Sequence, residues 1–130
     1  MAKKLGIKEG ARVALVGAPE GLERLLVGMP PGARVSRGMR GTAPVDVIVS
    51  FVTRASALDS AVEKGRARMA ESGGLWIAWP KKASGVKTDV TEDVVRRAAL
   101  EAGLVDNKVC AIDEVWSGLR LVVRVRDRKG

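Results

Sequence analysis

Val45-Asp-Val-Ile-Val-Ser-Phe-Val52 is the stretch that decides the fold class of this chain. Its residues are mostly β-branched and form an almost continuous apolar run, which is typical of a central strand buried on both faces of a parallel sheet. After it, apolar residues recur at helical spacing and predict a helix over residues 56–71 that ends at Ser72-Gly-Gly74. A buried strand followed by an amphipathic helix is the repeating unit of α/β proteins.

The rest of the chain repeats this alternation. We expect five further strands, over residues 12–17, 33–37, 75–80, 104–112 and 119–125. Helical spacing of leucines predicts a short helix over 22–28, and Asp89 with Glu92 has the spacing of a capping box that starts a later helix. The last two strands form a hairpin, which places one antiparallel strand at the sheet edge. The sequence therefore predicts one α/β domain over residues 1–130, with a three-layer, mainly parallel, doubly wound sheet that ends in an antiparallel hairpin.

Composition excludes several kinds of protein and site. The 130 residues include no histidine and one cysteine, Cys110, which rules out Ser-His-Asp and Cys-His catalysis and an ordinary structural zinc site. One cysteine cannot form an internal disulfide, so we expect a cytoplasmic protein that binds no metal. Residues 1–8 lack the apolar stretch of a signal peptide, and no apolar run approaches the ~20 residues that span a bilayer. We expect neither export nor membrane insertion.

The chain is basic, with 23 lysines and arginines against 15 acidic residues and a formal net charge of +8. Such a charge attracts polyanions at low salt. Arg120, Arg124 and Arg126 alternate with apolar residues in the last predicted strand, so we expect a half-exposed strand that offers a basic stripe to nucleic acid or an acidic partner. A solvated edge strand protected by charge is the alternative. Aromatic residues make up only 3% of the chain, which disfavours single-strand recognition by base stacking.

The loop over residues 17–21 is a candidate cofactor site. It follows the first predicted strand and precedes a helix, where open α/β sheets bind ligands and free N–H groups favour anions. Gly17, Ala18 and Gly21 are the residues that we expect to contact a cofactor. Pro19 offers no N–H donor and no glycine-rich nucleotide fingerprint is present, so a plain strand-to-helix turn is the alternative.

A second candidate site is the loop over residues 80–88, which follows a central strand. It concentrates lysines, hydroxyls and a flexible glycine, which together suit an anion such as phosphate. The expected ligand contacts are Lys81, Lys82, Ser84, Lys87 and, at the end of the strand, Trp79. Asp89, Glu92 and Asp93 follow directly, so internal ion pairing with the lysines is the alternative.

Other conspicuous residues receive structural interpretations. Trp76 and Trp79 differ by three positions in a strand, so we expect them on opposite faces of the sheet, with Trp76 in the core. Cys110 lies in a predicted strand without an activating base, and we interpret it as a small buried hydrophobic residue. Trp116 lies in the predicted hairpin connection, beside Asp113. The sequence identifies no catalytic residue.

Three stretches of the chain occur together in one known family: residues 5–19 (LGIKEGARVALVGAP), 73–85 (GGLWIAWPKKASG) and 104–120 (LVDNKVCAIDEVWSGLR). They resemble the bacterial family named domain of unknown function 3052, and the likeness covers nearly the whole chain. Its most specific segments are Trp79-Pro-Lys-Lys82 and Asp106-Asn-Lys-Val-Cys-Ala-Ile-Asp113. That family in turn is similar to shortened S-adenosylmethionine-dependent methyltransferases, which implies a methyltransferase-like Rossmann fold and makes S-adenosylmethionine a candidate cofactor.

Two departures from the methyltransferase pattern bear on function. Methyltransferases of this type usually carry an acidic residue at the end of the second strand for the ribose hydroxyls of the cofactor, whereas here that strand ends in Ser36-Arg37. The segment before Val45 is also too short for the usual extra strand and helix, which would leave a cofactor pocket with one wall missing. The resemblance therefore favours a noncatalytic or degenerate methyltransferase-like domain that binds a small anionic or nucleotide-like ligand. The alternatives are a minimal S-adenosylmethionine-dependent methyltransferase and a module that binds nucleic acid or an acidic partner through its basic surface.

Overall fold

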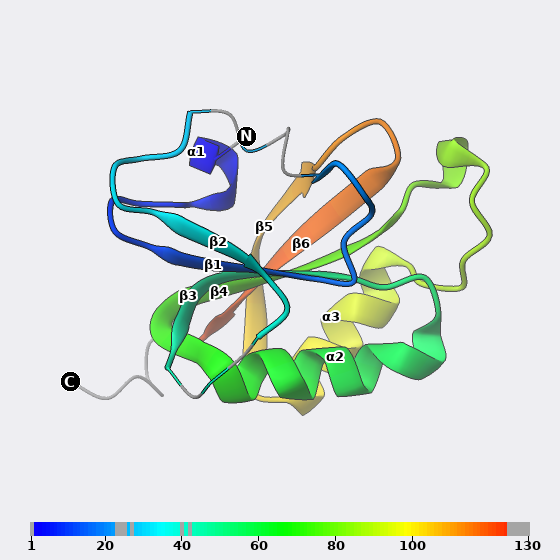
Figure 1. Ribbon diagram of the computed structural model, residues 1–130. Coiled ribbons are helices and arrows are strands. Elements are labelled where there is room, and N and C mark those ends of the chain that lie inside the picture. Colours follow the sequence, from blue (N-terminus) through cyan, green and yellow to red (C-terminus); the bar gives the residue numbers. More distant parts are fainter. Residues whose placement is uncertain (1, 23–25, 27, 40, 42, 125–130) are drawn as a thin grey trace.

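The computed structural model contains one six-stranded sheet with helices on both faces (Figure 1). It describes residues 2–22, 26, 28–39, 41 and 43–124. The elements, in chain order, are α1 (Ala2–Leu5), β1 (Arg12–Val16), β2 (Arg34–Arg37), β3 (Val45–Phe51), α2 (Ala55–Arg68), β4 (Met69–Pro80), the 3₁₀ helix η2 (Lys82–Ser84), α3 (Glu92–Glu101), β5 (Leu104–Ala111) and β6 (Trp116–Val123).

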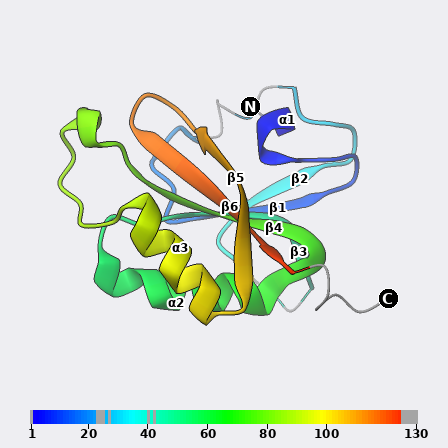
Figure 2. The same cartoon turned by 180° about the vertical axis from the view of Figure 1, so that it is seen from behind.

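The strand order β2-β1-β3-β4-β6-β5 confirms the predicted fold class. The first four strands in this order are parallel, and β6 is antiparallel to both of its neighbours. The predicted antiparallel hairpin at the end of the sheet is confirmed, but the strand that runs against the others, β6, lies one position inside the edge, between β4 and β5. The crossover through α3 places β5 two positions away from β4, and β6 then runs back between them. Seen from behind, β5 and β6 form one end of the sheet, with α2 and α3 on one face and α1 on the other (Figure 2).

The hydrophobic core has one layer on each face of the sheet. On the face that carries α1, strand side chains pack with Leu5, Ile7 and Leu22, and on the opposite face they pack with α2 and α3. Trp76 is fully buried on the α1 face, where its indole N–H donates to the carbonyl oxygen of Leu5 over 3.1 Å. Trp79 lies in the layer on the α2 face. The prediction that the two tryptophans lie on opposite faces is therefore confirmed.

The boundary between α2 and β4 differs from the prediction. We expected the helix to continue to residue 71 and the next strand to begin at 75, but α2 ends at Arg68 and β4 begins at Met69. Met69 pairs with Val45, so strand pairing begins before the two glycines that we interpreted as a helix stop. Gly73 instead allows β4 to pass close to β3, because a Cβ atom there would lie 2.5 Å from the carbonyl oxygen of Asp46.

The start of α3 was also predicted incorrectly. Thr91 is its N-cap, with the Val94 N–H donating to the Thr91 hydroxyl oxygen over 3.3 Å. The Asp89 carboxylate instead accepts a hydrogen bond of 2.7 Å from the backbone N–H of Ala55, the first residue of α2. Asp89 therefore caps a helix that is distant in sequence, which local spacing cannot reveal. The predicted helix over 22–28 falls largely outside the described residues, although Leu22 and Leu26 are buried as its apolar spacing requires.

The β6 strand is more buried than its alternating arginines predicted. Leu119, Leu121 and Val123 face the core as expected, but Val122, on the side that carries Arg120, is buried too. Arg120 lies inward: a Cβ atom on Gly74 would lie 2.5 Å from its Nε atom. β6 has a strand on each side, and α1 with the residues that follow it lies over the face that carries Arg120. The half-exposed strand that we predicted is therefore not formed.

The connection between β2 and β3 spans only residues 38–44, which leaves no room for an extra strand and helix. Arg68 holds it in place, donating from Nη1 to the carbonyl oxygen of Met39 and from Nη2 to that of Ala43, both over 2.9 Å. The helix α2 packs on β3 and β4, and α3 packs on β5 and β6. Within the described ranges, the α2 face of β1 and β2 is therefore left without a helix over it (Figure 1).

The close approach at Gly73 leads to a test of the β3–β4 register. Gly73→Ala places a methyl group against the Asp46 carbonyl oxygen, and we expect the free energy of unfolding to fall by about 1–3 kcal/mol, as for other overpacked sites. Urea denaturation measures this change. Ser72→Ala at the exposed neighbouring position is the control, for which we expect a change within about 0.5 kcal/mol. Equal stability of the two variants would contradict the contact.

The long-range cap of α2 leads to a second test. Asp89→Ala leaves the Ala55 N–H without its acceptor, and we expect a loss of about 0.5–2 kcal/mol in the free energy of unfolding, as for other helix caps. Glu114→Ala removes an exposed carboxylate outside the helices and should be nearly neutral. If chemical denaturation found both variants equally stable, Asp89 would not act as the cap.

Candidate functional site

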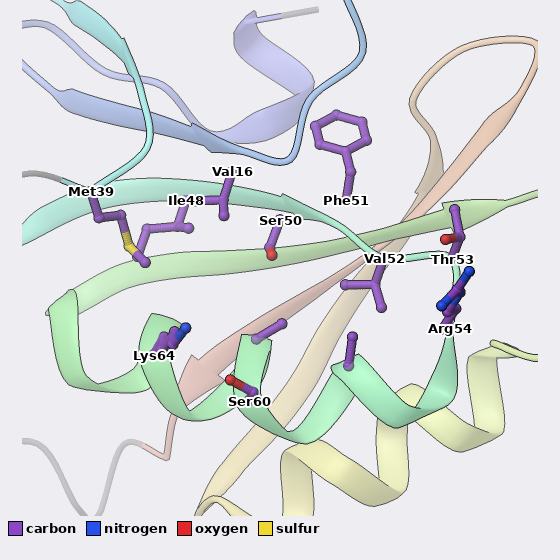
Figure 3. Close-up of a pocket in the computed structure, with 12 residues that line it drawn as sticks. Val16, Met39, Ile48, Ser50, Phe51, Val52, Thr53, Arg54, Ser60 and Lys64 are labelled. Carbon is purple, nitrogen blue, oxygen red and sulfur yellow. The ribbon is translucent and has the colours of Figure 1, made fainter.

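A cavity of about 360 Å³ lies between the carboxyl-terminal part of β3 and one side of α2, and we call it the β3–α2 cavity (Figure 3). Val16 at the end of β1 contributes to its lining, and Met39 lies at one end. In the sheet, β2 and β3 lie on opposite sides of β1. The connection from β1 to β2 therefore runs in one direction along the sheet, and the connection from β2 to β3 runs in the other. The cavity therefore lies at a topological switch point, which is where open α/β sheets bind ligands.

The floor of the cavity is apolar with one hydroxyl. Alternation along β3 turns Ile48, Ser50 and Val52 toward α2 (Figure 3). Ser50 is 5% exposed, and no other polar residue in the described part of the chain is buried. A buried hydroxyl in an apolar floor can fix the orientation of a ligand by hydrogen bonding.

The α2 wall is made of small and polar side chains. Ala57, Ser60, Ala61 and Lys64 line the cavity, and their i, i+3, i+4 and i+7 spacing places them on one side of the helix. The two alanines leave the space, because a larger side chain at either position would enter it. The cavity therefore results from small residues on one flank of α2 as well as from the missing helix beside it.

The rim of the cavity is positively charged. Arg54 and Lys64 are both exposed, and none of the described residues that line the cavity is acidic. The hydroxyl group of Thr53 adds a further polar group at the end of β3. An apolar floor, a few hydroxyls and two cations suit a small ligand with an apolar body and an anionic group.

The predicted cofactor loop over residues 17–21 is occupied by an arginine. Gly17 has a φ angle of 66°, in the left-handed region, and turns the chain away from β1. Arg37 reaches this loop from the end of β2, donating from Nη1 to the carbonyl oxygen of Ala18 over 3.0 Å and from Nη2 to that of Pro19 over 3.1 Å. Gly21 is exposed, with a φ angle of 79°. The guanidinium group therefore lies against Ala18, one of the three residues that we expected to contact a cofactor, and against its neighbour Pro19.

These residues do not fit S-adenosylmethionine in the manner usual for methyltransferases. The ribose hydroxyls of that cofactor need a carboxylate acceptor at the end of the second strand, and residues 34–45 contain no aspartate or glutamate. Arg37 brings a donor and a positive charge to the same place, which would also repel the sulfonium centre of the cofactor. The carboxylate that usually accepts from the ribose hydroxyls is therefore not found at the end of β2, where Arg37 lies instead.

The loop over residues 80–88 uses its hydroxyls to stabilise itself. The Ser84 hydroxyl donates to the carbonyl oxygen of Lys81 over 2.6 Å and accepts from the Val86 N–H over 3.1 Å. Lys82 and Lys87 are exposed, and Lys81 is half-buried. Ser84 therefore shapes the turn, and the lysines are the groups that remain available to an anion.

Internal ion pairing of these lysines is not observed in the described part of the chain. Glu92 and Asp93 pair with Arg96 instead, over 2.7 and 3.2 Å, and Arg96 also lies 3.3 Å from Asp106 on β5. The hydrogen bond that Arg96 donates to the Glu92 carboxylate is the main reason that the pKa of Arg96 is raised. With Asp89 engaged at α2, the three carboxylates that we expected to neutralise the lysines are occupied elsewhere.

The loop over residues 80–88, which we call the lysine loop, is held at the mouth of the β3–α2 cavity by hydrogen bonds. The Thr88 hydroxyl donates to the carbonyl oxygen of Thr53 over 2.7 Å, and Asp89 accepts from Ala55. The structure thus brings Lys87 to the neighbourhood of Thr53 and Arg54, which line the cavity. It does not bring Trp79 there, because that side chain is 7% exposed and packs in the core.

Aromatic residues cover the opposite side of the strand ends. Trp116 is the first residue of β6 and not part of a loop as predicted, because it pairs with Pro80. Its ring meets that of Phe51 edge to face, with centroids 5.0 Å apart. The Asp113 carboxylate accepts from the N–H groups of Val115 and Trp116, over 2.8 and 2.7 Å, so it stabilises the turn before β6.

Sequence reasoning missed the residues that make up the β3–α2 cavity. Ser50 carried a signal, since it interrupts an apolar strand that is buried on both faces. Ala57 and Ala61 carried another, because small residues four positions apart on a helix permit a close approach or leave a space. Neither signal says which element lies opposite, so the cavity could not be assembled from the sequence.

The remaining predicted surfaces are less prominent in the structure. Arg124 is half-buried, Arg120 lies inward, and Arg126 lies outside the described residues. No helix in the described ranges has the length and apolar character needed to cross a membrane. Among the same residues, no three side chains of cysteine, aspartate or glutamate gather into a group that would hold a metal ion.

No family model and no curated protein matches the chain, but solved structures match its fold. Fibrillarin from Aeropyrum pernix, in complex with natively bound S-adenosyl-L-methionine, is 16% identical with a TM-score of 0.61, over 89% of this chain and 68% of that one. Fibrillarin from Methanococcus jannaschii is 11% identical with a TM-score of 0.64, over 90% and 68%. A TehB-like S-adenosylmethionine-dependent methyltransferase from Corynebacterium glutamicum is 13% identical with a TM-score of 0.58, over 90% and 82%. The chain thus has a methyltransferase-like Rossmann fold, as the resemblance implies.

Proposed function

We propose that this protein is a noncatalytic methyltransferase-like domain that binds a small anionic or nucleotide-like ligand in the β3–α2 cavity. The observation that carries the proposal is the cavity itself: an apolar floor with the buried Ser50 hydroxyl, cations at Arg54 and Lys64, and no acidic residue among the described lining. Its volume of about 360 Å³ lies within the range of small-molecule sites, roughly 300–1,000 Å³. In this proposal the protein acts in the cytoplasm, and the chain is a member of the bacterial family named domain of unknown function 3052.

The lysine loop supplies further charge to the ligand in this proposal. Lys81, Lys82 and Lys87 have no carboxylate partner in the described part of the chain, and the loop is tied to the cavity mouth through Thr88. Cations that are not neutralised internally raise the local concentration of anionic ligands and speed their association. The lysines therefore attract the ligand, and the cavity holds its apolar part.

The position of Arg37 favours binding without methyl transfer. A minimal S-adenosylmethionine-dependent methyltransferase is the competing function, and the fold supports it. Arg37 opposes it, because its guanidinium group lies against the carbonyl oxygens of Ala18 and Pro19 where the cofactor ribose would be received. The ligand of the β3–α2 cavity is accordingly a different molecule from the methyl donor.

Thermal unfolding separates the two functions. We expect adenosine 5′-monophosphate to raise the midpoint and S-adenosylhomocysteine to leave it unchanged. A ligand at about 100 times its dissociation constant adds ~2.7 kcal/mol of stability, and ~1 kcal/mol moves the midpoint of a domain of this size by roughly 3–6 °C. A rise of several degrees with S-adenosylhomocysteine would contradict the proposal and support the methyltransferase. In that case methyl transfer itself should be measured.

A substitution that fills the cavity tests where the ligand binds. Ala57→Leu extends a side chain into the β3–α2 cavity, and we expect it to abolish the rise in midpoint caused by adenosine 5′-monophosphate. Ala67→Leu is the matched control, because Ala67 is an exposed alanine of the same helix that does not line the cavity. Both variants should fold, since leucine is a good helix former. Equal ligand responses of the two variants would place the binding site elsewhere.

A further inference from the structure

A second hollow, of about 300 Å³, lies on the same face of the sheet toward the amino-terminal ends of β1 and β2. We call it the arginine hollow, because Arg12, Arg34 and Arg68 contribute to its lining. Met39 lines both this hollow and the β3–α2 cavity, so the two spaces are neighbours across one side chain. The arginine hollow exists because no described helix covers this part of the sheet.

Arg12 and Arg34 are placed side by side by strand pairing. They are partners in the register of β1 with β2, and adjacent strands are about 4.8 Å apart. Both are exposed, and both line the hollow, so their side chains extend over the same face. Two like charges directly opposite each other on neighbouring strands are destabilising. An anion between them would reverse the sign of this interaction.

No carboxylate fills that role in the described part of the chain. Asp and Glu do not occur among the described residues that line the hollow. Asp46 is adjacent, but its carboxylate accepts from the backbone N–H of Arg12 over 2.8 Å and forms no ion pair within 4.0 Å with either guanidinium group. Arg68 donates to the carbonyl oxygens of Met39 and Ala43, so its role is to hold the wall of the hollow.

Solubility alone does not account for this pair. An exposed sheet face without a helix needs polar side chains, and Ser36 on the same strand meets that need. Charges of both signs would serve solubility equally well and would avoid the repulsion. The described lining of the hollow and of the cavity contains no acidic residue. The two arginines therefore resemble a phosphate site, in which two guanidinium groups converge on one group of oxygens.

We infer that Arg12 and Arg34 form a phosphoryl-binding subsite, and that the ligand is a phosphorylated small molecule. This inference rests on the proposed function, because it places the apolar part of the ligand in the β3–α2 cavity and the terminal phosphoryl group between the two arginines. Arg12 lies about 13 Å along β1 from Val16, which lines the cavity, and Met39 lies between the two spaces. Lys64 lines the cavity, and Met39, which lines both spaces, lies at one end of it (Figure 3).

Calorimetric titration with two probes, inorganic pyrophosphate and adenosine 5′-monophosphate, tests the subsite. We expect Arg12→Gln/Arg34→Gln to weaken the binding of both by about tenfold or more, as for the loss of hydrogen bonds between charged groups. The matched control is Lys8→Gln/Arg97→Gln, which removes the same charge from two exposed residues that line neither space and should bind both probes like the wild type. The arginine variant should also be at least as thermostable as the wild type, because it relieves the repulsion.

The outcomes separate this inference from the proposed function. Equal loss of pyrophosphate binding in both double variants, or no loss in either, would overturn the subsite, since only general surface charge would then act. Loss of pyrophosphate binding in the arginine variant but not in the control variant supports the subsite. Pyrophosphate should still bind to Ala57→Leu, because that substitution blocks only the cavity. Suppose that Ala57→Leu left the affinity for adenosine 5′-monophosphate unchanged while the arginine variant lowered it. The proposed binding in the cavity would then be refuted, and the phosphoryl subsite would be supported. Tighter binding of a single-stranded oligonucleotide than of the mononucleotide, lost in the arginine variant, would overturn the assignment to a small molecule.

Discussion

The pairing of β3 with β1 on one side and with β4 on the other is the constraint on which the rest of the structure depends. Val47, Ile48 and Val49 are almost completely buried and alternate between the two core layers, and each such side chain contributes about 1.5–3 kcal/mol on burial. A slip of one residue would exchange the two layers, so the register of all four parallel strands is fixed together. The cavity at the carboxyl-terminal part of β3 and the paired arginines at the start of β1 and β2 are both consequences of this register.

The short connection from β2 to β3 determines which part of the fold is available to a ligand. Within the described ranges, no helix covers the α2 face of β1 and β2. Arg12, Arg34 and Ser36 are exposed on that face, whereas β3 and β4 carry apolar residues over α2. The uncovered face thus contributes both space and positive charge beside the cavity. Arg37 packs against the loop after β1, on the side where a cofactor would lie.

The sequence predicted ligand loops at the carboxyl ends of the strands, but not the β3–α2 cavity beside them. The sequence placed lysines and hydroxyls after β4, and the carboxyl ends of parallel strands do gather these loops with the end of β3. The roles within the loop depend on its partners: Ser84 closes its own turn, Thr88 and Asp89 bind the residues around the start of α2, and Trp79 is buried. Hydrogen bonds between residues more than 30 positions apart cannot be predicted from local spacing. The sequence therefore does not show which polar side chains of the loop are available to a ligand and which ones stabilise the loop itself.

By itself, the sequence determined the alternation of strands and helices, the mainly parallel sheet, the opposite orientation of Trp76 and Trp79, and the absence of a carboxylate after β2. These follow from periodicity and residue type, which are local properties. Only the tertiary structure decided that α2 gives way to β4 at Met69, that β6 lies inside the sheet, that Asp89 caps α2, and that Arg12 faces Arg34. Each of these depends on which distant segment becomes a neighbour, and that choice is made by the burial and hydrogen bonding of the whole chain.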